Sequence, residues 1–438
     1  MKRLIRKFIP KFLLQTYHWC LASMGAWWYR YPSRRLIVIG VTGTKGKSTT
    51  VTLISRILEQ AGNTVGVVAT THFKIGSREW VNQTKQTMPG RFRLQQLLRE
   101  MVWCGCRYVV VETSSEGIAQ FRHVGIDYDL AVFTNLSPEH IESHGSFERY
   151  RDAKLRLFQR LSTLPTKVIA GERIPKMIVV NADDPEADRF LSADADRRFT
   201  YSLRPDQPVP QQSDMHVIAE RVAAYAHHTE FVLNHQLFRV WLLGTFNVYN
   251  ILAAACVGAA CGISWNQIRE AVEQNVQIPG RLEEISNLRR IRIFVDYAHE
   301  PASLESVYRA MKPLHAKHLI VVLGSQGGGR DRAKRPVMGT LAGTYADYVI
   351  VTNEDPYDED PQHIIDDVMA GVITAGKIRD QNCWAIPDRR AALSAALKLA
   401  QAGDVVLVTG KGSETVMAVS GGRLIPWDDR QAIRDILH

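Results

Sequence analysis

Hydrophobic residues fall in short continuous runs that alternate with stretches of helical periodicity. Runs rich in Val, Ile and Leu occupy residues 36–40, 64–69, 108–111, 130–134 and 177–180. Such runs are typical of strands buried on both faces of a parallel sheet. Between them, residues 91–102 and 147–161 repeat apolar side chains every three to four positions, which predicts helices. The alternation predicts a doubly wound α/β sheet.

A second series of the same kind follows residue 281. We expect strands at residues 291–295, 318–323, 348–352 and 405–408, and helices at residues 301–311, 363–370 and 389–402. The glycine-rich segment 324–330 lacks GxGxxG spacing, so we interpret it as a tight turn. The predicted parts are an N-terminal arm (1–35), a central domain (36–281) and a Rossmann-like C-terminal α/β domain (282–438).

The first 35 residues have a different pattern. Apolar residues recur every three to four positions from 4 to 21 with basic residues between them, which predicts an amphipathic helix kinked at Pro10. Residues 12–29 carry no formal charge, and Trp and Tyr gather near residue 30. Two interpretations stay open: a helical hairpin packed on the body or on a partner subunit, or an anchor at a membrane surface. Polar residues within so short a stretch disfavour a spanning helix.

Charge and composition exclude several classes of function. The net charge is +9, but the first 35 residues hold eight basic and no acidic residues, so the remaining chain is nearly neutral. A basic excess confined to one arm does not indicate nucleic-acid binding, and we expect none. The six cysteines form no CxxC pair, which disfavours a zinc ribbon and fits a reduced, cytoplasmic location, including the inner face of the membrane.

The clearest chemical motif directly follows the first strand. Glycines there let backbone N–H groups surround phosphates at a helix N-terminus. We expect Lys47 to reach the terminal phosphates of ATP and Ser48 to hold Mg²⁺. The predicted loop consists of Gly43, Thr44, Lys45, Gly46, Lys47, Ser48 and Thr49. The central domain is therefore predicted to be a P-loop ATPase domain.

Polar residues stand where the next strands end. Glu112 ends one strand, Asn135 ends another, and His140 lies shortly after it. Because catalytic groups gather at the carboxyl ends of parallel strands, Glu112 is a candidate Mg²⁺ ligand. His140 and His144 are four residues apart but do not form HExxH, so zinc is disfavoured.

Taken in order, these and later blocks resemble the Mur ligase family, over residues 36 to 438. The Tyr-Ala-His block, Lys-Arg-Pro at 334–336 and the Gly-Lys-Gly-x-Glu ending are most similar to the tripeptide synthetases of that family. The blocks are residues 43–49, 111–115, 134–145, 150–154, 244–250, 279–281, 296–299, 410–412 and 428–430.

The resemblance implies an ATP-dependent ligase that adds an amino acid to a peptide carboxylate through an acyl phosphate. Within the tripeptide synthetases, this would be the third residue of the peptidoglycan stem peptide. Lys47, Glu112, His140 and Lys154 would be catalytic, with Glu112 and His140 on Mg²⁺ and Lys154, if carbamylated, on a second metal ion. The residues implied to contact the nucleotide or hold the interdomain hinge are Asn247, Asn250, Arg281 and Asp296.

The substrates implied are a muramoyl-peptide-like acceptor and an amino acid. Thr87 lies in a segment similar to the acceptor loop, and Glu414 matches the group that holds the incoming amine; Gly410 precedes it. Tyr357 stands where diaminopimelate-adding relatives have arginine, which argues against diaminopimelate. The acidic residues around Asp355 fit a substrate with a free ammonium, such as lysine or ornithine, or alternatively form a solvated loop.

The N-terminal segment departs from the family pattern, and two other functions are compatible with the sequence. Only about 35 residues precede the first strand, which is fewer than the family's UDP-binding domain needs, so the acceptor's carrier stays open. Folylpolyglutamate synthetase, a relative with a similar phosphate loop, is the second enzyme considered. A non-catalytic nucleotide-binding scaffold, docked through the arm, is the third interpretation.

Overall fold

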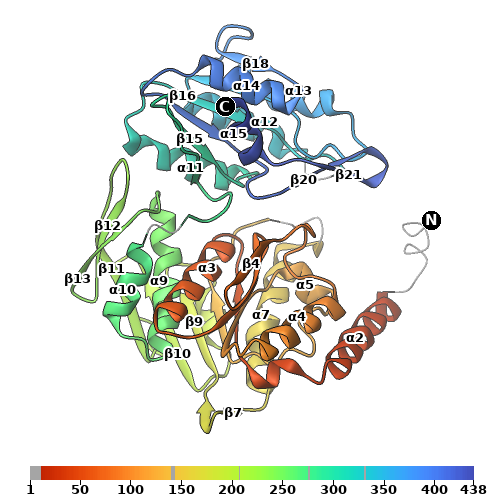
Figure 1. Ribbon diagram of the computed structural model, residues 1–438, viewed down its shortest axis with the longest axis vertical. Helices are drawn as coiled ribbons and strands as arrows, with labels where there is room; N and C mark the ends of the chain where they lie inside the picture. Colours follow the sequence, from red (N-terminus) through yellow and green to blue (C-terminus); the bar gives the residue numbers. More distant parts are fainter. Residues whose placement is uncertain (1–10, 140–143, 207, 275–276, 330–331) are drawn as a thin grey trace. The chain divides into compact units, whose positions relative to one another are not determined.

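The structure is a computed structural model that describes residues 11–139, 144–206, 208–274, 277–329 and 332–438. The chain forms two compact units (Figure 1). The first contains the chain up to residue 222 together with residues 231–238 and 247–274. The second contains residues 223–230, 239–246 and 275–438. Because short segments around residues 223–246 alternate between the units, the domain boundary at residues 281 and 282 stays a prediction.

The first unit is built on an eleven-stranded sheet in the order β13-β12-β11-β10-β9-β6-β1-β5-β2-β3-β4. From β11 to β2 neighbouring strands pair in parallel, and β3 and β4 add an antiparallel edge. The strands are β1 (Ile37–Thr42), β2 (Val65–Val68), β3 (His72–Ile75), β4 (Arg78–Val81), β5 (Tyr108–Glu112), β6 (Leu130–Phe133), β9 (Met177–Asn181), β10 (Arg197–Ser202), β11 (Met215–Ala224), β12 (Thr229–Leu233) and β13 (Gln236–Val240).

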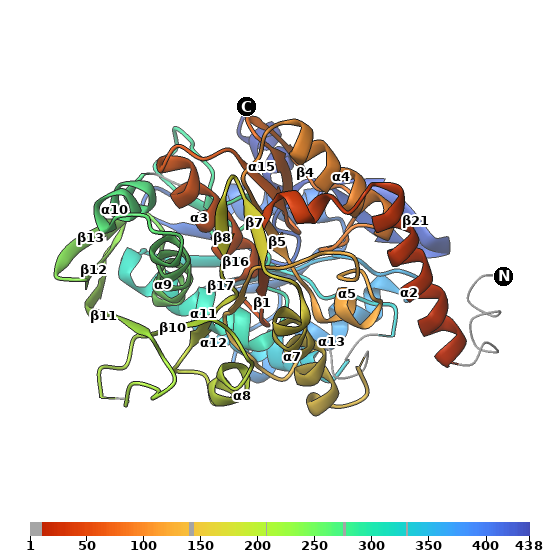
Figure 2. The ribbon, with the colours of Figure 1, turned by 90° about the horizontal axis from the view of Figure 1, so that it is seen from below.

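Helices cover both faces of this sheet (Figure 2). On one face, apolar side chains of the strands form a core with α4, α7 and α8. On the other, α3 packs on β2 and β5, with α10 against α3. The helices are α2 (Lys11–Trp28), α3 (Lys47–Gln60), α4 (Arg91–Trp103), α5 (Ser115–Ala119), α7 (Phe147–Thr163), α8 (Ala187–Leu191), α9 (Thr245–Ala260) and α10 (Trp265–Glu273), with a 3-10 turn η1 (Pro32–Arg35) and a small hairpin of β7 (Lys167–Ile169) and β8 (Glu172–Ile174).

The second unit holds a six-stranded sheet in the order β14-β15-β19-β16-β17-β18, parallel except for β14. One apolar core lies under α11, α12 and α13, and a second lies under α14 and α15. Its elements are β14 (Glu283–Glu284), β15 (Arg292–Val295), α11 (Pro301–Met311), η2 (Lys312–Leu314), β16 (Leu319–Leu323), α12 (Lys334–Tyr345), β17 (Tyr348–Val351), α13 (Pro361–Thr374), β18 (Cys383–Ala385), α14 (Arg389–Leu399), β19 (Val405–Val408), β20 (Val416–Val419), η3 (Ser420–Gly422), β21 (Arg423–Pro426) and α15 (Asp429–Leu437).

The doubly wound α/β fold predicted from the sequence is confirmed in both units. Most predicted strands begin and end within about one residue of their observed limits. Several elements were not anticipated, among them the edge strands β3 and β4, the helices α10, α12 and α15, and the strands β10 to β13 that extend the first sheet.

The N-terminal arm contributes α2, one face of which packs against α4. The predicted kink at Pro10 and the start of the amphipathic pattern lie outside the described residues. None of the helices in the described part of the chain is both long enough and apolar enough to span a membrane.

Candidate active site

The phosphate loop after β1 requires glycine at two positions. Gly46 caps α3 with φ 78°, and a Cβ there would lie 2.1 Å from Oδ1 of Asn250. A Cβ on Gly43 would lie 1.9 Å from Oγ1 of Thr134. Any larger residue would displace these neighbours. Such a tight loop at a helix N-terminus directs backbone N–H groups toward an anion.

Residues at the end of β6 hold this loop in place. The Thr44 N–H donates to the Asn135 carbonyl (2.8 Å), and the Lys45 N–H donates to the Asn135 side-chain oxygen (2.9 Å). The Thr134 hydroxyl donates to the Lys45 carbonyl (2.7 Å). Lys47 folds back over the loop and donates to the Thr44 carbonyl (2.8 Å). The ammonium group therefore lies beside the predicted phosphate cradle.

The Glu112 carboxylate links the loop to a neighbouring strand end. The Ser48 hydroxyl donates to Glu112 (2.9 Å), as does the Thr70 N–H just beyond β2 (2.8 Å). The Thr70 hydroxyl is hydrogen-bonded both to Glu112 (2.9 Å) and to the Thr87 hydroxyl (2.9 Å). The sequence did not single out Thr70, although its place after a strand end is the same signal that identified Glu112. Two of the predicted metal ligands, Ser48 and Glu112, thus form one network with the predicted acceptor residue Thr87.

Lys154 lies on α7, fully buried, and donates to the Gly43 carbonyl (2.7 Å). Its ammonium also sits 4.2 Å from the centre of the Tyr150 ring. Burial, and after it the charge of Lys47, lowers the pKa of Lys154 well below the usual lysine value. A buried lysine with a lowered pKa supplies the neutral amine that carbamylation needs.

The histidine pair is only partly visible, because His140 lies outside the described residues. His144 contacts the Ser115 hydroxyl (3.2 Å). Among the residues with defined placement, no three His, Cys, Asp or Glu side chains gather as a metal cluster. Mg²⁺ commonly binds one or two carboxylates together with substrate phosphates, so an oxygen set of Ser48 and Glu112 beside a phosphate loop fits this ion.

Asn247 and Asn250 share one face of α9, as their spacing predicted. Asn250 donates to the side-chain oxygen of Asn247 (2.9 Å), and both side chains are buried. Asn250 also accepts a long hydrogen bond from Thr50 (3.5 Å) and contacts Gly46. These asparagines therefore support the back of the phosphate loop.

In the second unit, the Pro279–Arg281 turn packs directly on the Gly410–Gly412 loop. Gly280 has φ 62°, and a Cβ there would lie 2.0 Å from the Ser413 nitrogen. Arg281 stacks on the Tyr297 ring at 4.5 Å. The Asp296 carboxylate accepts from the N–H groups of Leu282 and Ala298, both at 2.7 Å. Burial raises the pKa of Asp296, against the opposing charge of Arg281.

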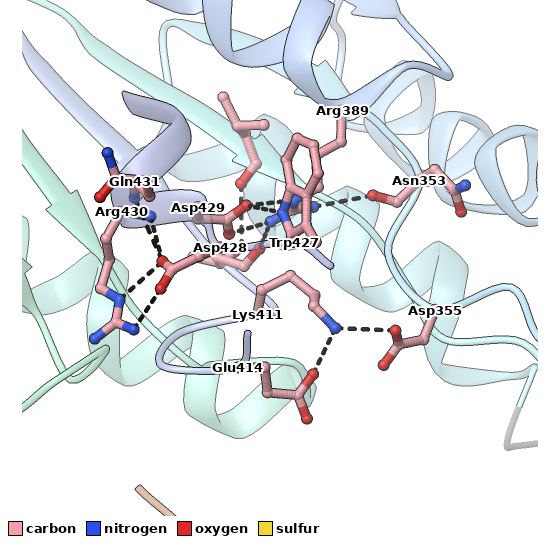
Figure 3. A network of polar contacts seen from close by, with 12 residues as sticks. Asn353, Asp355, Arg389, Lys411, Glu414, Trp427, Asp428, Asp429, Arg430 and Gln431 are labelled. Atoms are coloured by element: carbon pink, nitrogen blue, oxygen red, sulfur yellow. Dashed lines mark hydrogen bonds and ion pairs between the residues drawn. The ribbon is translucent and has the colours of Figure 1, made fainter. Parts of the chain in front are cut away.

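A buried ionic network organises the predicted amino-acid site (Figure 3). Lys411 pairs with Asp355 at 2.9 Å and with Glu414. Asp355 also accepts from the Ala418 N–H (2.7 Å). Asp355 therefore has partners within the chain, and its predicted contact with a substrate ammonium stays a prediction. It positions Lys411, which in turn holds the predicted amine-binding residue Glu414.

The other acidic residues of this segment are structural as well, with one exception. Asp358 accepts from the Gly421 N–H (2.8 Å), Glu359 pairs with Arg335, and Asp360 caps α13. Glu354 is fully buried, and neither of its oxygens has a hydrogen-bond partner among the described residues. Glu354 and Asp355 are therefore not part of a solvated loop, whereas Asp358 and Asp360 are exposed.

Glu354 faces the predicted substrate residue Gly410. A Cβ on Gly410 would lie 2.3 Å from Oε2 of Glu354, so only glycine fits there. Burial raises the pKa of Glu354, opposed first by the nearby charge of His299. A buried carboxylate without a partner is costly, and a cationic substrate group would relieve that cost.

The comparisons with known proteins identify the family. The profile of the Mur ligase middle domain matches residues 41–258, and that of the Mur ligase glutamate ligase domain matches residues 280–412. A UDP-N-acetylmuramyl-tripeptide synthetase from Roseiflexus sp. (strain RS-1) is 38% identical, covering 98% of this chain and 84% of that protein. The chain belongs to the Mur ligase family. It is accordingly an ATP-dependent ligase that forms amide bonds in the synthesis of peptidoglycan precursors.

Further proteins similar to this Mur ligase belong to the same family or share its fold. A UDP-N-acetylmuramoyl-L-alanyl-D-glutamate–2,6-diaminopimelate ligase from Geobacillus kaustophilus (strain HTA426) is 38% identical over 97% of this chain and 84% of its own. A solved structure of a ligase with the same title shows 31% identity and a TM-score of 0.61, covering 95% of this chain and 82% of that one. Folylpolyglutamate synthase from Mycobacterium tuberculosis shares the fold, with a TM-score of 0.67 at 15% identity over 90% of this chain and 92% of that one.

Proposed function

We propose that this Mur ligase adds the third amino acid to the stem peptide of a muramoyl-peptide acceptor in the cytoplasm. The network of Ser48, Glu112, Thr70 and Thr87 is the observation that carries the proposal, because it joins the phosphate loop to the predicted acceptor residue. The identity to a tripeptide synthetase across nearly the whole chain supports the choice of the third residue.

The proposed reaction has two steps. The acceptor carboxylate attacks the γ-phosphorus of ATP, and ADP leaves while Lys47 offsets the charge on the transferred phosphoryl group. The nitrogen of the amino acid, held by Glu414, then attacks the acyl carbon. The tetrahedral intermediate expels phosphate with its bonding electrons, and the nitrogen loses a proton to leave an amide. Water must be kept from the acyl phosphate between these steps.

Mg²⁺ fits the oxygen atoms of Ser48 and Glu112, and when bound it would neutralise phosphate charge. His140 is proposed as a further ligand by its resemblance to the family. Lys154 is proposed to bind a second ion after its neutral amine adds CO₂ and loses a proton. The resulting carbamate would supply the carboxylate oxygens that a buried ammonium cannot.

We further propose that the added amino acid carries a distal ammonium, as lysine and ornithine do. Tyr357 provides no guanidinium for the second carboxylate of diaminopimelate. Glu354 provides a buried carboxylate with no described partner beside Gly410. Both features favour a cationic side-chain end.

The test is a product analysis on the intact protein. It is incubated with ATP, Mg²⁺, nucleotide-linked or lipid-linked muramoyl dipeptide, and one amino acid at a time, and the products are weighed by mass spectrometry. The proposal expects one amino-acid residue to be gained, most efficiently with lysine or ornithine. Glutamate added to a folate acceptor, or nucleotide bound with no product from any pair, would instead support one of the two alternatives considered for the sequence.

A further inference from the structure

The outward face of α2 is unusually apolar for a helix on a protein surface. Large hydrophobic side chains here remain about half to two-thirds exposed. They are Leu13 (49%), Tyr17 (57%), Met24 (48%), Trp27 (64%) and Trp28 (66%), which share one side of the helix. We call these five residues the outer face. Clusters of this kind, as opposed to single exposed residues, mark interaction sites.

The opposite face of α2 fixes the helix to the first unit. Ala22 and Ala26 are buried, and a Cβ on Gly125 would lie 2.5 Å from the Ala26 Cβ. Gly25 lies against the first turn of α4, where its Cβ would be 3.6 Å from Phe92. Just beyond the helix, the Asp127 N–H donates to the Ser33 hydroxyl (3.0 Å). The outer face is therefore presented by a helix held firmly from behind.

In the sequence, basic residues both precede and follow α2, with no acidic residue among them. Four basic residues precede Lys11 in the sequence, and the chain has no Asp or Glu before Glu59. After the helix, Arg30 and Arg35 are exposed, whereas Arg34 pairs with Asp127 (3.2 Å). An apolar, Trp-rich strip between basic ends matches the acyl boundary and the anionic headgroups of a phospholipid surface.

We propose that the outer face of α2 docks this protein on the surface of an anionic phospholipid bilayer. The helix lies along the surface, since one side packs on protein and none of the described helices can span a bilayer. Trp and Tyr rings would sit at headgroup depth, with the flanking arginines and lysines on lipid phosphates. The combination of exposed Trp and Tyr rings with basic residues on both sides and no acidic residue favours a lipid surface. This inference goes beyond the ligase reaction and does not depend on it.

Vesicle flotation tests the proposal with the full chain. Vesicles of phosphatidylcholine alone are compared with vesicles containing about one third phosphatidylglycerol. The wild type is expected to float with the anionic vesicles and to be released at high salt. The double variant Trp27→Ser, Trp28→Ser is expected to lose about tenfold in vesicle affinity. Its ligase activity on a soluble acceptor should match the wild type, which separates docking from catalysis.

Trp103 provides the matched control. It is 71% exposed at the end of α4, outside the outer face, and Trp103→Ser makes the same chemical change there. Trp103→Ser should float as the wild type does. The proposal is overturned if the wild type does not bind anionic vesicles, or if Trp103→Ser loses as much vesicle affinity as the Trp27, Trp28 variant. It is also overturned if the wild type sediments as a dimer and the Trp27, Trp28 variant sediments as a monomer. The last would assign the outer face to a subunit contact.

Discussion

Two adjacent carboxylates, Glu354 and Asp355, are fully buried but are held in opposite ways. Asp355 has an ammonium and a backbone N–H as partners, whereas Glu354 has no described hydrogen-bond partner. A paired buried charge is destabilised by removing its counter-charge, while an unpaired one is itself the destabilising group. Neighbouring substitutions should therefore change stability with opposite sign.

Glu354→Gln is predicted to raise the free energy of unfolding by about 1–3 kcal/mol at neutral pH, because it removes an uncompensated buried charge. Burial raises the pKa of Glu354, so the folded state binds its proton more tightly than the unfolded state. The wild type consequently loses stability as the pH rises through the folded-state pKa. The gain from Glu354→Gln should shrink as the pH falls below about 4, where glutamate becomes protonated in the unfolded state as well. Denaturant unfolding across pH measures this.

Asp355→Asn is the matched control one residue away. It leaves Lys411 with Glu414 alone and should lower the unfolding free energy by about 3 kcal/mol. Equal destabilisation by both substitutions would contradict the distinction between the two carboxylates. If the proposed amino-acid site is also right, Glu354→Gln should raise the KM for the amino acid more than the KM for ATP.

Lys154→Arg is predicted to reduce activity by about a hundredfold, because arginine keeps the charge but cannot form a carbamate. Burial lowers the pKa of Lys154, so its amine is more often neutral near neutral pH than that of an exposed lysine. Labelling with isotopic bicarbonate, followed by carbon NMR, should show a carbamate in the wild type that disappears as the pH falls below the lysine pKa. A fully active protein without a carbamate signal would refute the assignment.

Individual site residues could be predicted from the sequence where a residue type at a given place in a motif has one common chemical role. Glu112 and Ser48 were predicted from a strand end and a phosphate loop, and the structure joins them by a hydrogen bond. The sequence did not reveal that Asp355 is paired, because its partner Lys411 lies 56 residues away in the sequence. The local sequence around a residue does not show which distant residue it pairs with in the fold.

At the scale of elements, the start of α3 depends on one glycine. Gly46→Ala is predicted to lower the unfolding free energy by about 3 kcal/mol and to weaken nucleotide binding about tenfold or more, because the new Cβ would overlap Asn250. Calorimetric titration with ADP and thermal unfolding measure the two effects.

Gly62, just beyond the other end of α3, is the matched control. It has φ 81°, similar to the 78° of Gly46, but a Cβ there meets nothing within 4 Å. Gly62→Ala should therefore show only the backbone strain of about 1 kcal/mol and leave nucleotide binding unchanged. If both variants bind nucleotide equally well, the loop does not hold the phosphates.

Two of the elements that the sequence missed have separate physical explanations. Helix α12 contains Gly339 and Gly343, which reduce its apparent helix propensity, yet a Cβ on Gly339 would lie 1.9 Å from the Val368 carbonyl of α13. Close packing of two helices therefore overrides propensity. Strand β12 alternates buried and partly exposed residues, but its sequence Thr-Glu-Phe-Val-Leu does not alternate apolar and polar residues, so periodicity does not identify it. The continuous apolar strands were predictable because both their faces are covered.

At the scale of the whole molecule, substrate choice is the property that relatives leave open. Tyr357→Arg is predicted to shift the ratio of kcat/KM for diaminopimelate over lysine about tenfold or more toward diaminopimelate, because a guanidinium can bind the second carboxylate. Competition assays with both amino acids measure the ratio. Tyr357→Phe should leave it unchanged, and an unchanged ratio in the arginine variant would place the distal group elsewhere.

The central claim is that the acceptor carboxylate takes the γ-phosphoryl group of ATP to form an acyl phosphate. The most direct test uses acceptor labelled with heavy oxygen in its reacting carboxylate, followed by mass analysis of the released phosphate. We predict that each phosphate released with product contains one labelled oxygen, and that Lys47→Ala, although folded, releases none. Phosphate without label, formed at the same rate in the absence of acceptor, would show that water attacks ATP and would contradict the ligase mechanism.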